Sequence, residues 1–133
     1  MRWLAAAALW LGASGAAFAQ APGGPPPPPP EGASAQVLQG AAEFQQHCAL
    51  CHGTRGRDAA VFPRPIWGPG QDIAKFGTAK GLFEYVQLLM PFDNPAKLDD
   101  RQKTAIVVYL LVRNGTLPAG ASLPQGGNDS AIK

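Results

Sequence analysis

The stretch EFQQHCALCHG, residues 43–53, places two cysteines three positions apart and a histidine directly after the second. Cys48 and Cys51 are the only cysteines in the chain. Three kinds of chemistry use thiols and an imidazole at this spacing: a disulfide, a metal ion such as zinc, and a covalently attached haem. These three kinds of site need different further residues elsewhere in the chain, so the rest of the sequence helps to distinguish them.

The order C-x-x-C-H, residues 48–52, is typical of covalent haem c attachment. In this arrangement the two cysteines form thioethers along one porphyrin edge, and the imidazole of His52 binds the iron. A redox disulfide has no need of His52, and a zinc site would need a fourth ligand, for which His47 is the only other histidine. The motif therefore favours one haem c, with a structural disulfide as the alternative.

The first residues, MRWLAAAALWLGASGAAFA, carry one positive charge at Arg2, then an apolar run, and end in a small-x-small site at residues 17–19. This order predicts a secretory signal peptide over residues 1–19, and hence a periplasmic protein. The apolar run is shorter than the roughly 20 residues that a membrane-spanning helix needs. An uncleaved membrane anchor is the alternative interpretation, and no transmembrane span is expected once the signal is removed.

Two flanking segments differ in composition from the middle of the chain. Residues 20–35 contain six consecutive prolines, which favour an extended polyproline II conformation and predict a flexible linker. Residues 118–133 are rich in Gly, Pro, Ser and Asn and predict a flexible C-terminal tail. The remaining 36–117 form the predicted domain, which is small enough to need a cofactor or covalent staple for stability.

Apolar residues at helical spacing predict three main helices, over residues 35–47, 78–90 and 98–115. Thr78 and Asp99 suit the helix-capping positions. The segment between the first two helices, residues 53–71, is rich in Gly and Pro and is predicted to be loop. A loop this long is unusual in a small all-α domain unless it wraps around something.

Met90 is the candidate for the second axial ligand of the iron. Met1 and Met90 are the two methionines, and Met1 leaves with the signal. Met90 falls at a predicted helix end, where Pro91 stops the helix and can direct the sulfur back across the cofactor. The alternatives are a methionine that only fills a gap in the core, and His47 as the ligand instead.

The order helix, C-x-x-C-H, long loop, helix, Met-Pro, helix resembles the class I cytochrome c family over about residues 36–117. The chain further resembles cytochrome subunits of periplasmic dehydrogenases, such as sulfite dehydrogenase, in the stretches FGTAKGLFEYVQLLMPFDNPAKL and AIVVYLLVRNG. The resemblance implies a small all-α fold, with three main helices and loops wrapped around one covalent haem. It also implies that Gly40 and Phe44 of the first helix pack against Ile106 and Tyr109 of the last.

Two further cofactor-binding residues are expected in the loop PRPIWG, residues 63–68. The resemblance implies a loop proline whose carbonyl accepts the N–H of His52. Pro63 and Pro65 are the candidates, and Pro65 is favoured. Trp67, the only tryptophan after the signal, is expected on the haem rim with its indole N–H toward a propionate, with ordinary core packing as the alternative.

The expected function is electron transfer, not catalysis. The formal net charge is +2, which argues against nucleic-acid binding, and no catalytic set such as Ser-His-Asp stands out. Ligation by His52 and Met90 fills both axial positions of the iron and raises its reduction potential. The expected partners are a redox donor and acceptor, one of them a periplasmic dehydrogenase. The alternative is a haem-based sensor in which Met90 is displaceable.

Overall fold

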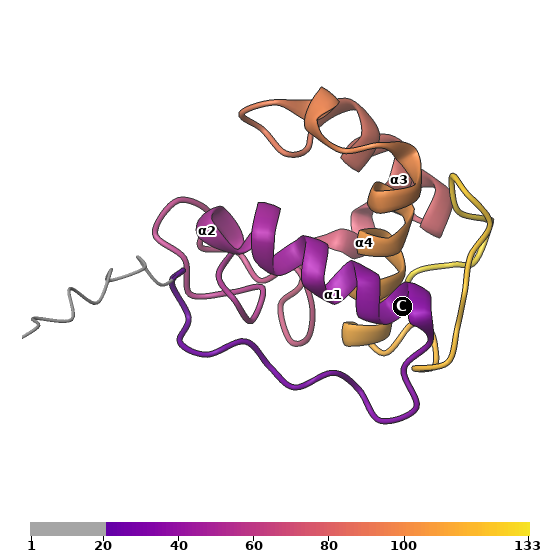
Figure 1. Ribbon diagram of the computed structural model, residues 1–133, viewed down its shortest axis with the longest axis horizontal. Coiled ribbons are helices and arrows are strands. Elements are labelled where there is room, and N and C mark those ends of the chain that lie inside the picture. Colours follow the sequence, from indigo (N-terminus) through magenta and orange to yellow (C-terminus); the bar gives the residue numbers. More distant parts are fainter. Residues whose placement is uncertain (1–20) are drawn as a thin grey trace, which may run out of the picture.

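Helices dominate residues 21–133, which are the part of the chain that the computed structural model describes (Figure 1). In chain order they are α1 (Ala35–His47), α2 (Ala49–His52), the 3₁₀ helix η1 (Ile73–Phe76), α3 (Ala79–Leu89), the 3₁₀ helix η2 (Pro95–Lys97) and α4 (Asp100–Arg113). The β pairing in this part is one isolated bridge between Thr78 and Ala131. The all-α prediction is confirmed, while the predicted signal peptide lies outside the described residues.

Each of the three long helices begins at a side-chain cap. The side chains of Ser34 and Thr78 each accept a backbone N–H from the first turn of α1 and α3, at 3.1 Å. Asp99 and Gln102 form a reciprocal capping box at the start of α4, with bonds of 2.8 and 3.0 Å. These bonds satisfy N–H groups that have no partner within the helix, which fixes where each helix starts.

Helices α1 and α4 cross at close range in the middle of the molecule (Figure 1). Gly40 of α1 faces the backbone of α4 beside Tyr109, and the rings of Phe44 and Tyr109 lie 5.7 Å apart between their centroids. The expected pairing of Gly40 and Phe44 with the last helix is therefore confirmed at Tyr109.

The centre of α4 is buried on all sides, from Lys103 through Leu111. A helix that is buried on every side needs other elements to pack against each of its faces. Here α1 and α3 cover it, together with the loop residue Trp67, whose ring packs against Phe44 and Tyr109 at centroid distances of 5.3 and 5.8 Å. Helix α4 is therefore the rigid support on which the other elements are placed.

The proline-rich segment before α1 lies along the domain, which differs from the flexible linker expected over residues 20–35. The Thr54 hydroxyl donates to the Gly24 carbonyl at 2.8 Å, and the Arg113 guanidinium donates to the Pro28 carbonyl. Prolines lack N–H donors but keep their carbonyl acceptors, so an extended proline segment remains free to bind donors from a neighbouring surface.

The C-terminal segment also packs on the domain, which differs from the flexible tail expected over residues 118–133. The Gln36 side chain bonds both backbone groups of Leu123, at 2.8 and 3.1 Å. Further along, the Ala79 N–H donates to the Ser130 carbonyl at 2.9 Å. Composition alone predicted a loose segment, but α1 and α3 supply polar partners for its backbone.

Within residues 21–133, no helix is both long and apolar enough to cross a membrane.

Candidate functional site

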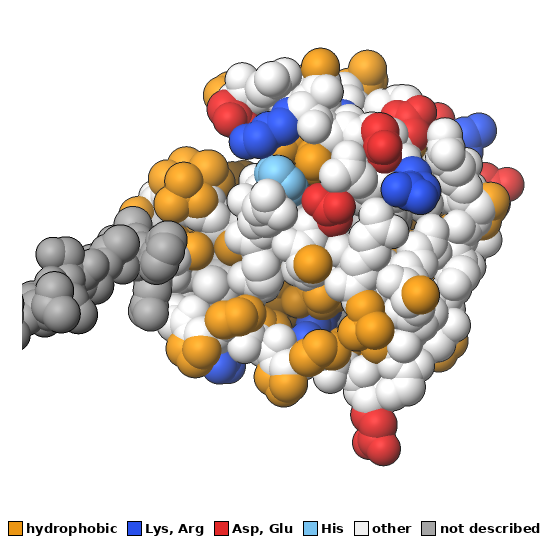
Figure 2. All heavy atoms as spheres, in the orientation of Figure 1, with side chains coloured by type: hydrophobic (Ala, Val, Ile, Leu, Met, Phe, Trp, Pro, Cys, Tyr) orange, Lys and Arg blue, Asp and Glu red, His pale blue; other side chains and the backbone are white. Residues whose placement is uncertain are grey.

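A cavity of about 660 Å³ opens between the α1–α2 corner, α3 and the segment that follows α3. Its volume lies in the range of cofactor pockets. In Figure 2, hydrophobic side chains are exposed on both sides of the notch below the uppermost loop. The buried part of the wall is apolar, and its members are Phe44, Ile66, Ile73, Leu82, Val86, Pro91, Ile106 and Leu110.

Four of the predicted site residues line this one cavity: Cys48, Cys51, His52 and Met90. Cys48 follows the last residue of α1, and α2 turns Cys51 and His52 toward the same space. Both thiols are free, so the cysteines do not form the alternative disulfide in this structure. The local sequence explains the corner, because Gly53 ends α2 at a φ of 78°, a value that favours glycine.

The His52 ring lies edge-on to Phe62, with ring centroids 4.8 Å apart and an interplanar angle of 65°. Its Nδ1 atom is buried and has no hydrogen-bond partner among the described residues. Burial lowers the pKa of His52, because water no longer stabilises the charged imidazolium. The neutral imidazole is the form that binds a metal, so this surrounding suits an iron ligand.

Met90 reaches the cavity from the end of α3. Its backbone N–H still donates to the Val86 carbonyl at 3.0 Å, but its own φ and ψ of −124° and 142° are extended. The residue before a proline avoids the helical region, so Pro91 explains why the helix stops here. The partly buried Met90 packs against the core and lines the cavity that His52 also lines.

Cys48 is a poor nucleophile in the unmodified chain. Burial raises its pKa to about 12, and the nearby Cys51 and Glu43 act in the same direction. The thiolate is the reactive form of cysteine, so the folded domain keeps this thiol protonated at neutral pH.

The two loop residues expected at the cofactor are not among those that line the cavity. Trp67 is 9% exposed and packs in an aromatic core with Phe44 and Tyr109. Gly56 makes room for it, since a Cβ atom there would lie 2.4 Å from the indole. The Pro65 carbonyl accepts the Asp72 N–H at 2.9 Å, and the bond expected from His52 is not formed.

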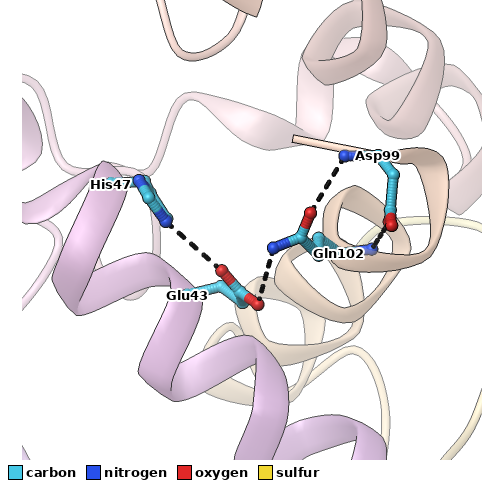
Figure 3. Close-up of polar contacts among 4 residues, drawn as sticks. All are labelled: Glu43, His47, Asp99 and Gln102. Carbon is cyan, nitrogen blue, oxygen red and sulfur yellow. Dashed lines mark hydrogen bonds and ion pairs between the residues drawn. The ribbon is translucent and has the colours of Figure 1, made fainter. Parts of the chain in front are cut away.

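His47 lines the cavity beside Cys48 and takes part in a polar network that joins α1 to α4 (Figure 3). Its Nε2 atom lies 3.4 Å from a Glu43 carboxylate oxygen one turn earlier. The other Glu43 oxygen accepts the Gln102 amide at 3.0 Å, and Gln102 also forms the Asp99 capping box. Sequence reasoning missed this network, because the bond that joins its two halves links Glu43 to Gln102, which are 59 residues apart along the chain.

Sequence reasoning also missed the side chains around the cavity mouth. Leu50, Val61 and Phe92 are 69%, 71% and 85% exposed and line the opening. Lys75 and Lys97 lie on it beside Asp72 and Asp93, so its charge is mixed. Leu50 lies in the short α2 and Val61 and Phe92 lie in loops, so none of them belongs to a long periodic pattern, and only the folded arrangement brings them together.

The donor set fits a haem. A porphyrin is a flat, mostly apolar ring with a metal at its centre, and this cavity offers an apolar wall of matching character. It also offers one neutral imidazole and one thioether for the metal, and two thiols next to that imidazole in sequence.

Comparison with known proteins agrees with the fold described above. Residues 35–110 match the family model described as cytochrome C oxidase, cbb3-type, subunit III. The chain therefore belongs to this cytochrome c family and is a class I c-type cytochrome, an electron-transfer protein of a family that carries haem c.

Several solved chains resemble this one, and one of them matches it over much of its length. It is the crystal structure of the sulfane dehydrogenase SoxCD from Paracoccus pantotrophus, with a TM-score of 0.56 and 25% identity. The match covers 64% of this chain and 46% of that one, so the cytochrome spans less than half of the matched chain. No curated protein matches the chain.

Proposed function

We propose that this cytochrome holds one haem c covalently through thioethers from Cys48 and Cys51, with His52 and Met90 as the axial ligands. The observation that carries the proposal is that all four side chains line one apolar cavity, although Met90 is far from the motif in sequence. The packing of His52 against Phe62 supports a fixed imidazole.

The haem iron supplies the one-electron chemistry, and the chain's residues set how readily it occurs. The Met90 thioether favours ferrous iron and so raises the reduction potential. The apolar wall acts in the same direction, since it disfavours the extra charge of ferric haem. Helix α2 packs on α1, and both α1 and α3 pack on the buried α4. This rigid framework would keep the rearrangement of the ligands between oxidation states small.

The cytochrome is proposed to act in the periplasm, between a dehydrogenase and a respiratory acceptor. The predicted signal peptide over residues 1–19 supports export, and the similarity to SoxCD supports a dehydrogenase as the electron donor. Leu50, Val61 and Phe92 give the cavity mouth an exposed apolar rim at which a redox partner can approach the haem edge.

Expression in the periplasm with haem maturation proteins tests the attachment. Denaturing electrophoresis with haem staining should show a stained band for the wild type. Cys48→Ala and Cys51→Ala should lose most of the stain, whereas Leu50→Ala, between the two cysteines and 69% exposed, should keep it. A wild-type band without haem stain would contradict the proposal.

A second experiment separates the carrier from the sensor. A carrier should show six-coordinate spectra in both oxidation states, should bind CO only slowly in the ferrous state, and should accept electrons stoichiometrically from a dehydrogenase. Ready binding of CO to the wild-type ferrous protein would instead favour a sensor with a displaceable Met90.

A further inference from the structure

Lys103 is a buried lysine in the middle of α4, 3% exposed. Lysine is rarely buried to this degree unless its ammonium group is paired. Here the ammonium donates to two backbone carbonyls, that of Gln87 at 2.8 Å and that of Pro95 at 2.6 Å. Hydrogen bonds from a charged donor are about twice as strong as those between neutral groups.

The two carbonyls lie on either side of Met90 in the sequence. Gln87 belongs to the last turn of α3, whose final carbonyls have no partner within the helix. Pro95 is the first residue of η2, on the segment that leaves Met90. One ammonium group from α4 therefore holds the chain both before and after the methionine.

The charge of Lys103 also suits the end of α3. A helix C-terminus carries a partial negative charge, and a cation near it is stabilising. Helix α3 has no basic residue in its own last turn, so Lys103 supplies that cation from a neighbouring helix. The Gln87 side chain adds a second tie to α4, because its amide donates to Asp100 at 3.0 Å.

We infer that Lys103 is a positioning residue for the Met90 ligand: it fixes both flanks of the methionine so that the sulfur stays directed into the cavity. This inference rests on the proposed function, in which Met90 binds the iron. Lys103 is not among the residues that line the cavity, and it acts through the backbone on each side of Met90.

The test compares Lys103→Met and Lys103→Gln with Thr104→Val in the haem-loaded protein. Methionine fills the space without any donor, and glutamine keeps one donor group on a shorter side chain. Thr104 is the matched control, since it is 1% exposed and its hydroxyl bonds the Asp100 carbonyl and the Gly126 N–H, away from the flanks of Met90. Denaturation of each variant gives the loss of global stability against which the ligand effects are judged.

Three measurements report on the ligand. They are the weak far-red sulfur-to-iron band of the ferric protein, the rate of CO binding to the ferrous protein, and amide hydrogen exchange over residues 91–97. Both Lys103 variants should bind CO about tenfold faster or more, the factor that corresponds to losing one charge-assisted hydrogen bond. Their far-red band should disappear at a lower denaturant concentration than their helical signal, and exchange over residues 91–97 should quicken.

Thr104→Val should leave all three readouts as they are in the wild type, even at an equal loss of stability. The inference is overturned if the Lys103 variants bind CO at the wild-type rate, or if CO binding follows global stability alone in all three variants. Met90→Ala, measured in parallel, separates a failure of the proposed ligation from a failure of the positioning role. A band that survives Met90→Ala overturns the ligation and the inference together, whereas a band lost there but untouched in the Lys103 variants overturns only the positioning role.

Discussion

Gly40 of α1 lies directly against the backbone of α4: a Cβ atom added to Gly40 would sit 1.9 Å from the Ala105 carbonyl oxygen and 2.8 Å from the Tyr109 Cβ. Real Cβ atoms essentially never come so close to another heavy atom. The neighbour is backbone in the middle of a buried helix, so it has little freedom to move aside. The two helices can therefore cross at this distance only because residue 40 is glycine.

Gly40→Ala should thus destabilise the domain by about 3 kcal/mol, the upper end of the usual cost of overpacking a core. Gly40→Val should cost more, because its branched side chain needs a wider separation of the helices. Chemical denaturation of the ferric protein measures the loss. Gly120→Ala is the matched control, since its Cβ would meet its nearest neighbour at 3.6 Å and should leave the midpoint unchanged. A Gly40→Ala protein with the wild-type midpoint would show that the helices do not cross this closely.

Gln36 should contribute to stability through the C-terminal segment. Its side chain bonds both the N–H and the carbonyl of Leu123, which is 8% exposed. Gln36→Ala should cost about 1–2 kcal/mol, the value of two partly buried hydrogen bonds, and should speed proteolysis of residues 118–133. Gln39→Ala, a glutamine on the same helix, should change neither. If Gln36→Ala and Gln39→Ala behave alike, the segment is loose in solution, as its composition predicts.

Glu43 should couple α1 to α4 beside His47, which lines the cavity. Its two oxygens face His47 and Gln102, at 3.4 and 3.0 Å. Glu43→Ala should cost about 1 kcal/mol, whereas Glu43→Gln should retain most of the bond to Gln102. Both changes remove a negative charge near the cofactor and should raise the reduction potential, because that charge favours ferric iron. Potentiometry and denaturation check the two effects, with the exposed Glu84→Ala as the control. A potential that falls or stays constant in both Glu43 variants would contradict this account.

The sequence predicted most of the helical framework, and the reasons are local. Ser34, Thr78 and Asp99 are side chains that cap helices, and Pro91 is a residue that stops one. Such signals depend only on neighbouring residues, so they can be read without knowing the fold. The C-x-x-C-H motif is equally local, and for that reason the sequence could indicate its chemistry.

What the sequence could not predict depends on contacts between distant segments. Trp67 lies within a Gly- and Pro-rich loop, and nothing in the local sequence decides whether its side chain joins the cavity rim or the core, where Gly56 makes space for it. Lys103 falls within a capped helix, where a lysine is expected on the surface. Only the fold shows that its ammonium group bonds the backbone before and after Met90. Leu123 lies in a stretch whose composition favours disorder, yet Gln36 holds its backbone.

Substitution of Met90, the proposed second axial ligand, is the strongest test of the site. Met90 ends α3 in an extended conformation, Pro91 fixes the direction of the chain after it, and its side chain lines the cavity together with His52. If its sulfur binds iron, the ferric protein should show a weak far-red sulfur-to-iron band. Met90→Ala should erase that band, open the iron to CO and azide, and lower the reduction potential by on the order of 0.1 V, a fraction of the roughly 0.8 V range that axial ligands control.

Met90→His should keep the iron six-coordinate and still lower the potential, because imidazole supports ferric iron better than a thioether does. Haem attachment should survive both changes, since Cys48, Cys51 and His52 are untouched. Leu89→Ala is the control: Leu89 is the neighbouring residue, 46% exposed and not among the residues that line the cavity, so its loss should leave band and potential as they were. An unchanged spectrum and potential in Met90→Ala would make Met90 a packing residue. His47 would then be the next candidate ligand, because it also lines the cavity, and a sensor would become a better account of the protein than a carrier.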